Sequence, residues 1–134
     1  MPQFAANLTM LFNELPFLDR FAAAKAAGFN AVEYLFPYEF EKGALREELA
    51  RSGLTQVLHN LPAGNLAACE RGISILRDRV DEFRDGVAPA IDSAKALSSR
   101  KLNCLVGIAP TCADDAGLPE VRAPTARSRA GRPA

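Results

Sequence analysis

Short apolar runs and amphipathic stretches alternate along the first 110 residues of the chain. Buried strands are predicted over residues 4–7, 31–36, 55–60 and 101–107, where such runs end at turn-forming residues. Helices are predicted over residues 17–27, 43–52 and 79–97, where large apolar residues recur every three or four positions. This order favours right-handed crossovers and a parallel sheet, so we expect an α/β fold built from four parallel βα-type units.

Proline and glycine mark the ends of the predicted helices. Pro16 sets the backbone for a first helical turn, and Gly28 and Gly53 stand where a left-handed residue ends a helix. Pro89 is a misfit, since it has no N–H for the carbonyl of Asp85 and would bend the third helix. The apolar face of that helix is predicted to comprise Val80, Phe83, Val87, Ile91, Ala94 and Leu97.

Strict alternation along the strands predicts one face that carries polar groups on all four. That face would hold Asn7, Glu33 and Asn103, with Gln56 and Asn60 on the third strand. Buried parallel sheets are normally apolar on both faces, so polar groups in this pattern indicate an interior that opens to a ligand site. In open α/β sheets and in barrels such a site lies at the carboxyl ends of the strands.

Each of these residues also has a purely structural interpretation. An asparagine at a strand end is frequently a turn or cap residue, and Glu33 could be a structural carboxylate with a neighbouring amide or arginine as partner. His59 has the parity opposite to Asn60, so we expect it to face the helices as a packing residue rather than as a catalytic base. The cysteines are expected to be small buried residues or tail residues: Cys69, Cys104 and Cys112.

Charge, apolar runs and cysteine content argue against several classes of protein. The 16 basic and 16 acidic side chains cancel, which argues against binding to nucleic acid or to a membrane surface through bulk charge. No apolar run approaches the roughly 20 residues of a transmembrane helix, no secretory leader is evident, and three cysteines form no disulfide framework. No phosphate-binding glycine loop occurs. We therefore expect a soluble protein of a reducing, cytoplasmic compartment.

The character of the chain changes after Pro110. Residues 111–134 contain three of the nine prolines and show neither helical nor strand periodicity. Such a segment cannot bury enough apolar surface to offset the entropy of ordering it. The predicted organisation is an α/β domain over residues 1–110 and an irregular tail over residues 111–134.

An ordered set of sequence blocks resembles the hydroxypyruvate isomerases, within the xylose isomerase-like TIM barrel family. The resemblance covers residues 2 to about 110, which would be the N-terminal half of a barrel. Its blocks are Phe4–Phe12, Pro16–Phe17 followed by Arg20–Ala24, Ala27–Tyr38, Asn60–Asn65 and Lys101–Gly107.

This resemblance implies an isomerase that interconverts hydroxypyruvate and 2-hydroxy-3-oxopropanoate through an enediolate. It implies substrate hydrogen bonding by Asn7 and Asn60, a supporting role for Glu33, and an apolar wall formed by Phe12 and Phe36. The family's acid/base carboxylates come from the second half of the barrel. A barrel takes about 250 residues, so this chain is expected to lack them, to have no assignable catalytic residue or metal ligand, and to be inactive alone. Mg²⁺ or Mn²⁺ would belong to the full-length family.

A second hypothesis comes from another functional class. A half barrel exposes the edges of its first and last strands, and unpaired edges promote association. The chain could therefore be a non-catalytic α/β domain that forms a homo-oligomer or binds a partner through these edges.

Overall fold

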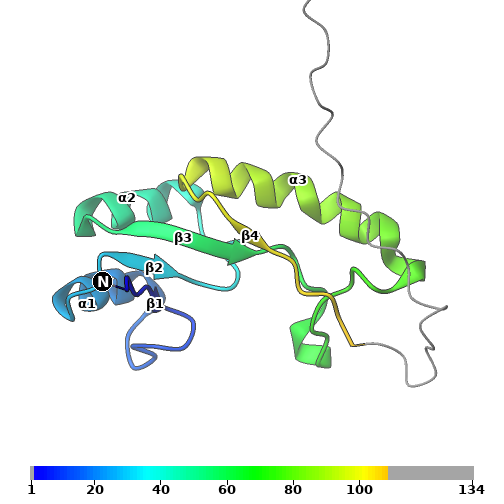
Figure 1. The fold of residues 1–134 in the computed structure, drawn as a ribbon, viewed down its shortest axis with the longest axis horizontal. Helices are drawn as coiled ribbons and strands as arrows, with labels where there is room; N and C mark the ends of the chain where they lie inside the picture. Colours follow the sequence, from blue (N-terminus) through cyan, green and yellow to red (C-terminus); the bar gives the residue numbers. More distant parts are fainter. Residues whose placement is uncertain (1, 109–134) are drawn as a thin grey trace, which may run out of the picture.

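The computed structural model describes residues 2–108, and the expectations for the tail over residues 111–134 lie outside this range. It contains one sheet of four parallel strands in the order β1-β2-β3-β4 (Figure 1). The strands are β1 (Ala6–Asn7), β2 (Ala31–Glu33), β3 (Thr55–Asn60) and β4 (Leu102–Asn103). The prediction of four parallel βα-type units is confirmed, although β1, β2 and β4 are shorter than the apolar runs suggested.

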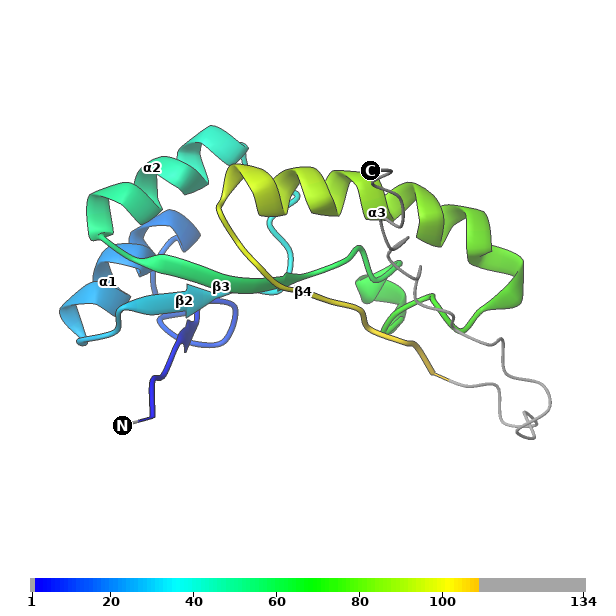
Figure 2. The same cartoon turned by 45° about the horizontal axis from the view of Figure 1, so that its top comes forward.

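Three α-helices connect the strands: α1 (Arg20–Ala26), α2 (Lys42–Ser52) and α3 (Val80–Ala96). A 3₁₀ turn, Phe17–Asp19, precedes α1, and two more, Leu66–Ala68 and Arg77–Arg79, lie in the loop before α3. Figure 2 shows α2 and α3 along one side of the sheet, and α2 packs against both α1 and α3. Among residues 2–108, no helix combines the length and apolarity that crossing a bilayer requires.

The hydrophobic core lies between the sheet and the first two helices. Ala6, Leu8, Val32 and Tyr34 contribute from β1, β2 and the residues that follow them. The helices and adjoining turns add Phe21, Ala24, Leu45, Leu49, Leu54 and Leu97. Tyr34 is 1% exposed, and Phe17 and Phe21 pack against its ring edge-to-face. Aromatic pairs of this kind each add about 0.5–1.5 kcal/mol beyond the burial of area.

Strand β3 contains an irregularity that corrects the predicted faces of the sheet. Val32 pairs with Gln56, but the next residue, Glu33, pairs with Leu58, so β3 has one additional residue against β2. Such a bulge shifts the alternation of side chains by one position. Gln56 therefore lies on the helix side, and its predicted place beside Leu58 and Asn60 is wrong.

The shifted strand builds a buried polar chain beneath α3. The Tyr34 hydroxyl donates to Gln56 Oε1 at 2.5 Å, and Gln56 Nε2 lies 3.1 Å from His59 Nδ1. His59 Nε2 lies 3.3 Å from the carbonyl oxygen of Ala90. Because a carbonyl can only accept, Nε2 carries the proton and Nδ1 accepts from Gln56. His59 is thus a satisfied packing residue that faces the helices, as its parity predicted.

Two other expectations about packing need correction. The buried positions of α3 and its C-cap are Ala90, Ser93, Ala94 and Leu97, whereas Ile91 is 40% exposed. Of the predicted apolar face, Ala94 and Leu97 are thus buried, whereas Val80, Phe83 and Val87 are partly buried. Small residues, Ala90 and Ser93, complete the buried face of α3. Cys69 is exposed rather than buried. Pro89, the residue that does not fit the helical pattern, lies inside α3, and the helix continues beyond it to Ala96.

Left-handed residues end the helices, and one of them is not glycine. Gly28 and Gly53 have φ of 90° and 60°, as predicted for helix ends. Ser98, which follows the C-cap of α3, adopts φ of 55°. A side chain in this region costs about 1 kcal/mol relative to glycine.

We expect Ser98→Gly to raise the free energy of unfolding by about 0.5–1 kcal/mol. Gly53→Ala is the matched opposite, because a Cβ at Gly53 would meet no atom within 4 Å, so its cost of about 1 kcal/mol is purely conformational. Urea denaturation of both variants measures the two effects. Equal stability of Ser98→Gly and the parent would show that φ at residue 98 carries no strain.

The buried histidine predicts a pH dependence of stability. Burial lowers the pKa of His59, and the hydrogen bond to the Ala90 carbonyl only partly opposes this. The unfolded chain therefore binds a proton more readily, and stability should fall as pH drops below about 6.5, the ordinary histidine value, toward the folded pKa.

His59 is the sole histidine of the chain, so its imidazole NMR signals titrate without overlap. We expect a midpoint below 6.5 in the folded protein and near 6.5 in 8 M urea. A His59→Gln variant should lose the acid-dependent fall in stability over this pH window. A folded midpoint at or above 6.5 would contradict the buried neutral state.

Candidate functional site

The side of the sheet that faces away from the helices carries two lateral pairs of polar side chains. Asn7 Nδ2 donates to Glu33 Oε1 at 2.9 Å, which joins β1 to β2. Asn103 Nδ2 donates to Asn60 Oδ1 at 3.0 Å, which joins β3 to β4. The structure therefore brings three of the predicted site residues, Asn7, Glu33 and Asn60, to one face.

Further hydrogen bonds fix Asn7 and Asn60, one residue of each pair. The Asn7 side-chain oxygen also accepts from the Thr9 N–H at 3.0 Å. Asn7 therefore also acts as a turn residue at the end of β1, which was the structural role considered for it. Asn60 is 3% exposed, and its backbone oxygen accepts from the Tyr38 hydroxyl at 2.5 Å. Burial raises the pKa of Tyr38 to about 12, so its hydroxyl stays protonated and remains a donor.

A recess of about 210 Å³, which we call the inner recess, opens between the polar pairs. It is lined by Glu33, Tyr34, Leu35, Leu58, Asn60, Asn103 and Leu105. The polar groups of this lining are one carboxylate and two amides, and the rest is largely aliphatic. This combination suits a small polar ligand whose oxygens meet amide N–H donors.

A larger recess of about 440 Å³, the mouth recess, lies where β1, β2 and β3 lead into their loops. Its lining comprises Thr9, Phe17, Arg20, Phe36, Tyr38, Glu39, Phe40, Pro62, Ala63, Gly64 and Leu66. The predicted wall residue Phe36 is part of it. Phe12 packs against the hydrophobic core instead, with φ of 60°, and lines neither recess.

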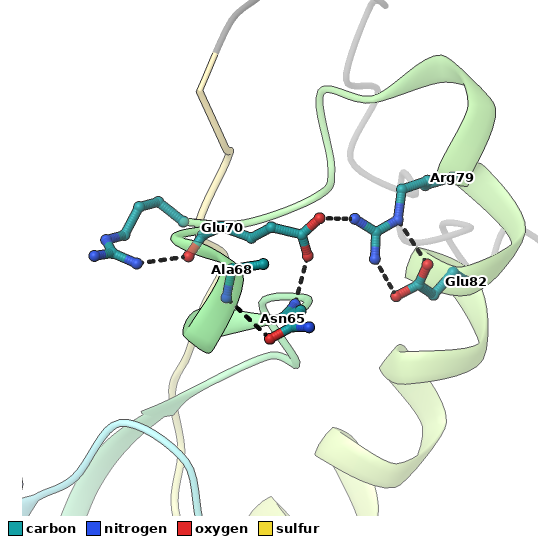
Figure 3. Close-up of polar contacts among 6 residues, drawn as sticks. Asn65, Ala68, Glu70, Arg79 and Glu82 are labelled. Carbon is teal, nitrogen blue, oxygen red and sulfur yellow. Dashed lines mark hydrogen bonds and ion pairs between the residues drawn. The ribbon is translucent and has the colours of Figure 1, made fainter.

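An ion-pair network fixes the loop between β3 and α3, which forms one wall of the mouth recess. The Glu70 carboxylate accepts from the backbone N–H of Asn65 and from Arg79, and Arg79 also donates to Glu82 at 2.6 and 2.7 Å (Figure 3). The Asn65 side chain accepts from the Ala68 N–H at 3.1 Å and caps the short turn. These contacts tie the loop to the start of α3.

Several of these groups were not identified from the sequence. Tyr38 and Glu70 are bound by partners 5 to 22 positions away, and no periodic pattern encodes such contacts. Arg20 occurs in one of the sequence blocks that resemble the isomerases, but the pattern suggested no role for it. Asn103 was predicted to lie on the polar face with no assigned role, and in the structure its side chain donates a hydrogen bond to Asn60.

The described residues do not fit a divalent metal. Within residues 2–108, no three side chains of His, Cys, Asp or Glu come together as a cation site. Glu33 has an amide as its neighbour rather than a second carboxylate, whereas Mg²⁺ and Mn²⁺ prefer several oxygen ligands including carboxylates. We therefore derive no chemical step through a metal.

Comparison with known proteins gives consistent matches. The sequence model of the family described as "Xylose isomerase-like TIM barrel" matches residues 21–129, which extends into the segment where the sequence alone showed no resemblance. Hydroxypyruvate isomerase of Escherichia coli is 53% identical over 110 residues, which are 82% of this chain and 43% of that protein. A 2-oxo-tetronate isomerase of Pectobacterium atrosepticum is 50% identical, over 82% of this chain and 42% of its own length.

A solved structure agrees with these matches. The crystal structure described as AP endonuclease, family 2, from Brucella melitensis superposes with a TM-score of 0.79 and 51% sequence identity. The superposition covers 81% of this chain and 42% of the other. The chain thus spans somewhat less than half the length of the relatives that it matches.

The Glu70 network predicts an acid-sensitive loop. The hydrogen bond from the Asn65 N–H, and then the contact with Arg79, lower the pKa of Glu70, so its contribution is present above the ordinary carboxylate value and is lost as pH falls through the folded pKa. Glu70→Gln should therefore speed amide hydrogen exchange at Asn65 and remove its acid dependence. Glu47→Gln, an exposed change on α2, is the control. Unchanged exchange at Asn65 in Glu70→Gln would contradict the role of this network.

Proposed function

The chain belongs to the xylose isomerase-like TIM barrel family, and on that basis we propose that residues 2–108 form the substrate-binding half of an isomerase site. The substrates are short 2-oxo acids with a hydroxyl group on the next carbon. Hydroxypyruvate is the first candidate and 2-oxotetronate the second, because proteins with these two names match at 53% and 50% identity. The observation that carries the proposal is that Glu33 and Asn60 line the inner recess, with Asn7 hydrogen-bonded to Glu33 on the same face of the sheet.

The proposed reaction interconverts hydroxypyruvate and 2-hydroxy-3-oxopropanoate. A base removes a proton from C3 of hydroxypyruvate, and the electron pair forms the C2–C3 double bond of the enediolate while the negative charge moves to the C2 oxygen. The C2 oxygen then takes up the proton that the C3 hydroxyl gives up, a proton returns to C2, and the C3 oxygen becomes the aldehyde carbonyl. The step needs donors for the oxygen that gains negative charge and a carboxylate for proton transfer.

Amide donors are what the described residues contribute. Asn60 uses its side-chain oxygen for Asn103, so its amide nitrogen is the group that it offers to a ligand. Glu33 accepts one N–H of Asn7 and so orients that amide, whose second N–H is free of Glu33. Donors held in place before the reaction stabilise a developing oxyanion without reorganisation.

Proton transfer is assigned to groups outside residues 2–108. The carboxylate that lines the inner recess is Glu33, and its Oε1 is engaged by Asn7. The hydrogen bond from Asn7 makes the Glu33 carboxylate better suited to orienting the Asn7 amide than to removing a proton from the substrate carbon. The proposed division is therefore that this half binds and orients the substrate, while the acid/base carboxylates come from elsewhere.

A second candidate function is self-association through the sheet edges. β1 and β4 each pair with only one strand in the described sheet, and Val106 and Ile108, beyond β4, are 52% and 67% exposed. The occupant that we propose is a second copy of this chain, because two four-stranded parallel sheets supply the eight strands of a closed barrel.

The test is a titration of the ¹⁵N-labelled 134-residue chain with hydroxypyruvate, with and without Mg²⁺. We expect saturable shifts of the side-chain amides of Asn7, Asn60 and Asn103, and at least a tenfold loss of affinity in Asn60→Ala. Asn30→Ala is the matched control, because Asn30 is an exposed asparagine whose side chain contacts Lys25. The same samples, monitored by ¹H NMR for the aldehyde of the product, should show no turnover.

Each outcome has a defined meaning. Absence of shifts at the three asparagines would overturn the substrate-binding proposal. Turnover by the chain would overturn the assignment of the acid/base groups to other residues. A dimer in sedimentation velocity that leaves the asparagine signals insensitive to hydroxypyruvate would favour self-association as the function.

A further inference from the structure

Arg20 is a half-buried cation on the wall of the mouth recess. Its Nε donates to the carbonyl of Leu15 at 3.0 Å, and its Nη1 donates to the carbonyl of Leu8 at 2.7 Å and to Asn13 Oδ1 at 2.8 Å. All three acceptors are uncharged oxygens. No carboxylate of residues 2–108 forms an ion pair with Arg20.

These three hydrogen bonds fix the orientation of the guanidinium group through Nε and Nη1, and they do not involve Nη2. The Arg20 side chain packs over the Phe17 ring, with its central carbon 5.7 Å from the ring centroid, and Phe17 itself stacks on Phe40. Nη2 makes no hydrogen bond to the described part of the chain. An arginine whose other donors are fixed loses little side-chain entropy when it binds an anion, which favours binding.

The mouth recess adjoins the polar face on which the proposed function rests. Arg20 contacts the carbonyl of Leu8, the residue directly after Asn7. Thr9, which lines the recess, donates its backbone N–H to the Asn7 side chain. Phe36, also in the lining, follows Leu35, which belongs to the inner recess. The two recesses are therefore lined by consecutive residues of the segment that follows β2, and the mouth recess also includes Thr9, the residue that binds the Asn7 side chain.

We propose that Arg20 is a specificity-determining residue that binds the carboxylate of the short 2-oxo acid, while the amides of Asn7 and Asn60 face its carbonyl and hydroxyl oxygens. This inference rests on the proposed function and deepens it. Arginine is suited to carboxylates because its planar donors match their two oxygens. Partial burial beside aromatic rings strengthens the interaction relative to that of an exposed arginine.

Glu39 offers a second, independent electrostatic probe. Its exposed carboxylate lines the same recess, so it repels an anion bound there. Removing that charge leaves Arg20 and its three loop contacts unchanged. The proposal therefore requires opposite effects of the two charges on the binding of an anion.

The experiment compares hydroxypyruvate with hydroxyacetone, in which a methyl group replaces the carboxylate. NMR titration of the 134-residue chain should show tighter binding of hydroxypyruvate, by about tenfold or more. Arg20→Met should remove this preference, and Glu39→Gln should increase hydroxypyruvate affinity about two- to fourfold. Asn13→Ala, which removes one loop contact but keeps the charge, should preserve the preference.

The controls distinguish two roles of Arg20, binding the substrate carboxylate and only holding the loop in place. They also distinguish failure of this inference from failure of the proposed function. An Arg20→Met chain that binds hydroxypyruvate as well as the parent overturns the inference, as does equal loss of hydroxyacetone and hydroxypyruvate binding. Higher salt should weaken hydroxypyruvate binding and leave hydroxyacetone binding unchanged, which a loop-anchoring role alone would not produce. Pyruvate that binds through Arg20 while Asn60→Ala has no effect would support the carboxylate site and overturn the isomerase site.

Discussion

The arrangement of polar groups in this structure depends on one additional residue in β3. Val32 pairs with Gln56 and Glu33 with Leu58, so the strand changes the direction of its side chains between these two positions. With strict alternation, Gln56 and Asn60 would share a face, and one of them would lack its present partners. The irregularity sends Gln56 toward Tyr34 and His59, and Asn60 toward Asn103 on the other side. One strand can thus contribute to a buried polar chain on one face and to a second set of polar groups on the other, which strict alternation of Gln56 and Asn60 would not allow.

The two faces that result differ in how completely their polar groups are satisfied. On the helix side, the chain from Tyr34 through Gln56 and His59 to Ala90 ends in a carbonyl, so the donors along it have acceptors. A buried network that is fully satisfied stabilises one arrangement of sheet and helix. On the other side, the amides are only partly engaged, and they lie beside an open recess. The buried polar chain and the recess that we propose for ligand binding therefore lie on opposite faces of β2 and β3.

The sequence predicted what depends on local pattern and missed what depends on register or distant contacts. The order of strands and helices follows from apolar periodicity, and Gly28 and Gly53 mark helix ends because few other residues tolerate their backbone conformation. The face of Asn60 was predicted correctly because it lies beyond the bulge, whereas Gln56 lies before it. No alternation rule locates an inserted residue, since the bulge becomes visible only when the partner strand is known.

The contacts of loop residues were inaccessible to sequence pattern for a different reason. Arg20 binds the carbonyls of Leu8 and Leu15, and Tyr38 binds the carbonyl of Asn60, so their partners are backbone atoms that every residue possesses. A backbone acceptor leaves no mark in the identity of the partner residue. These side chains order the segments that follow β1 and β2, and they also contribute to the mouth recess. Groups that hold the loops in place thus coincide with groups that line the mouth recess. In the proposed site, specificity would follow from few charges, because Arg20 would select an anion and the amides of Asn7 and Asn60 would set its orientation.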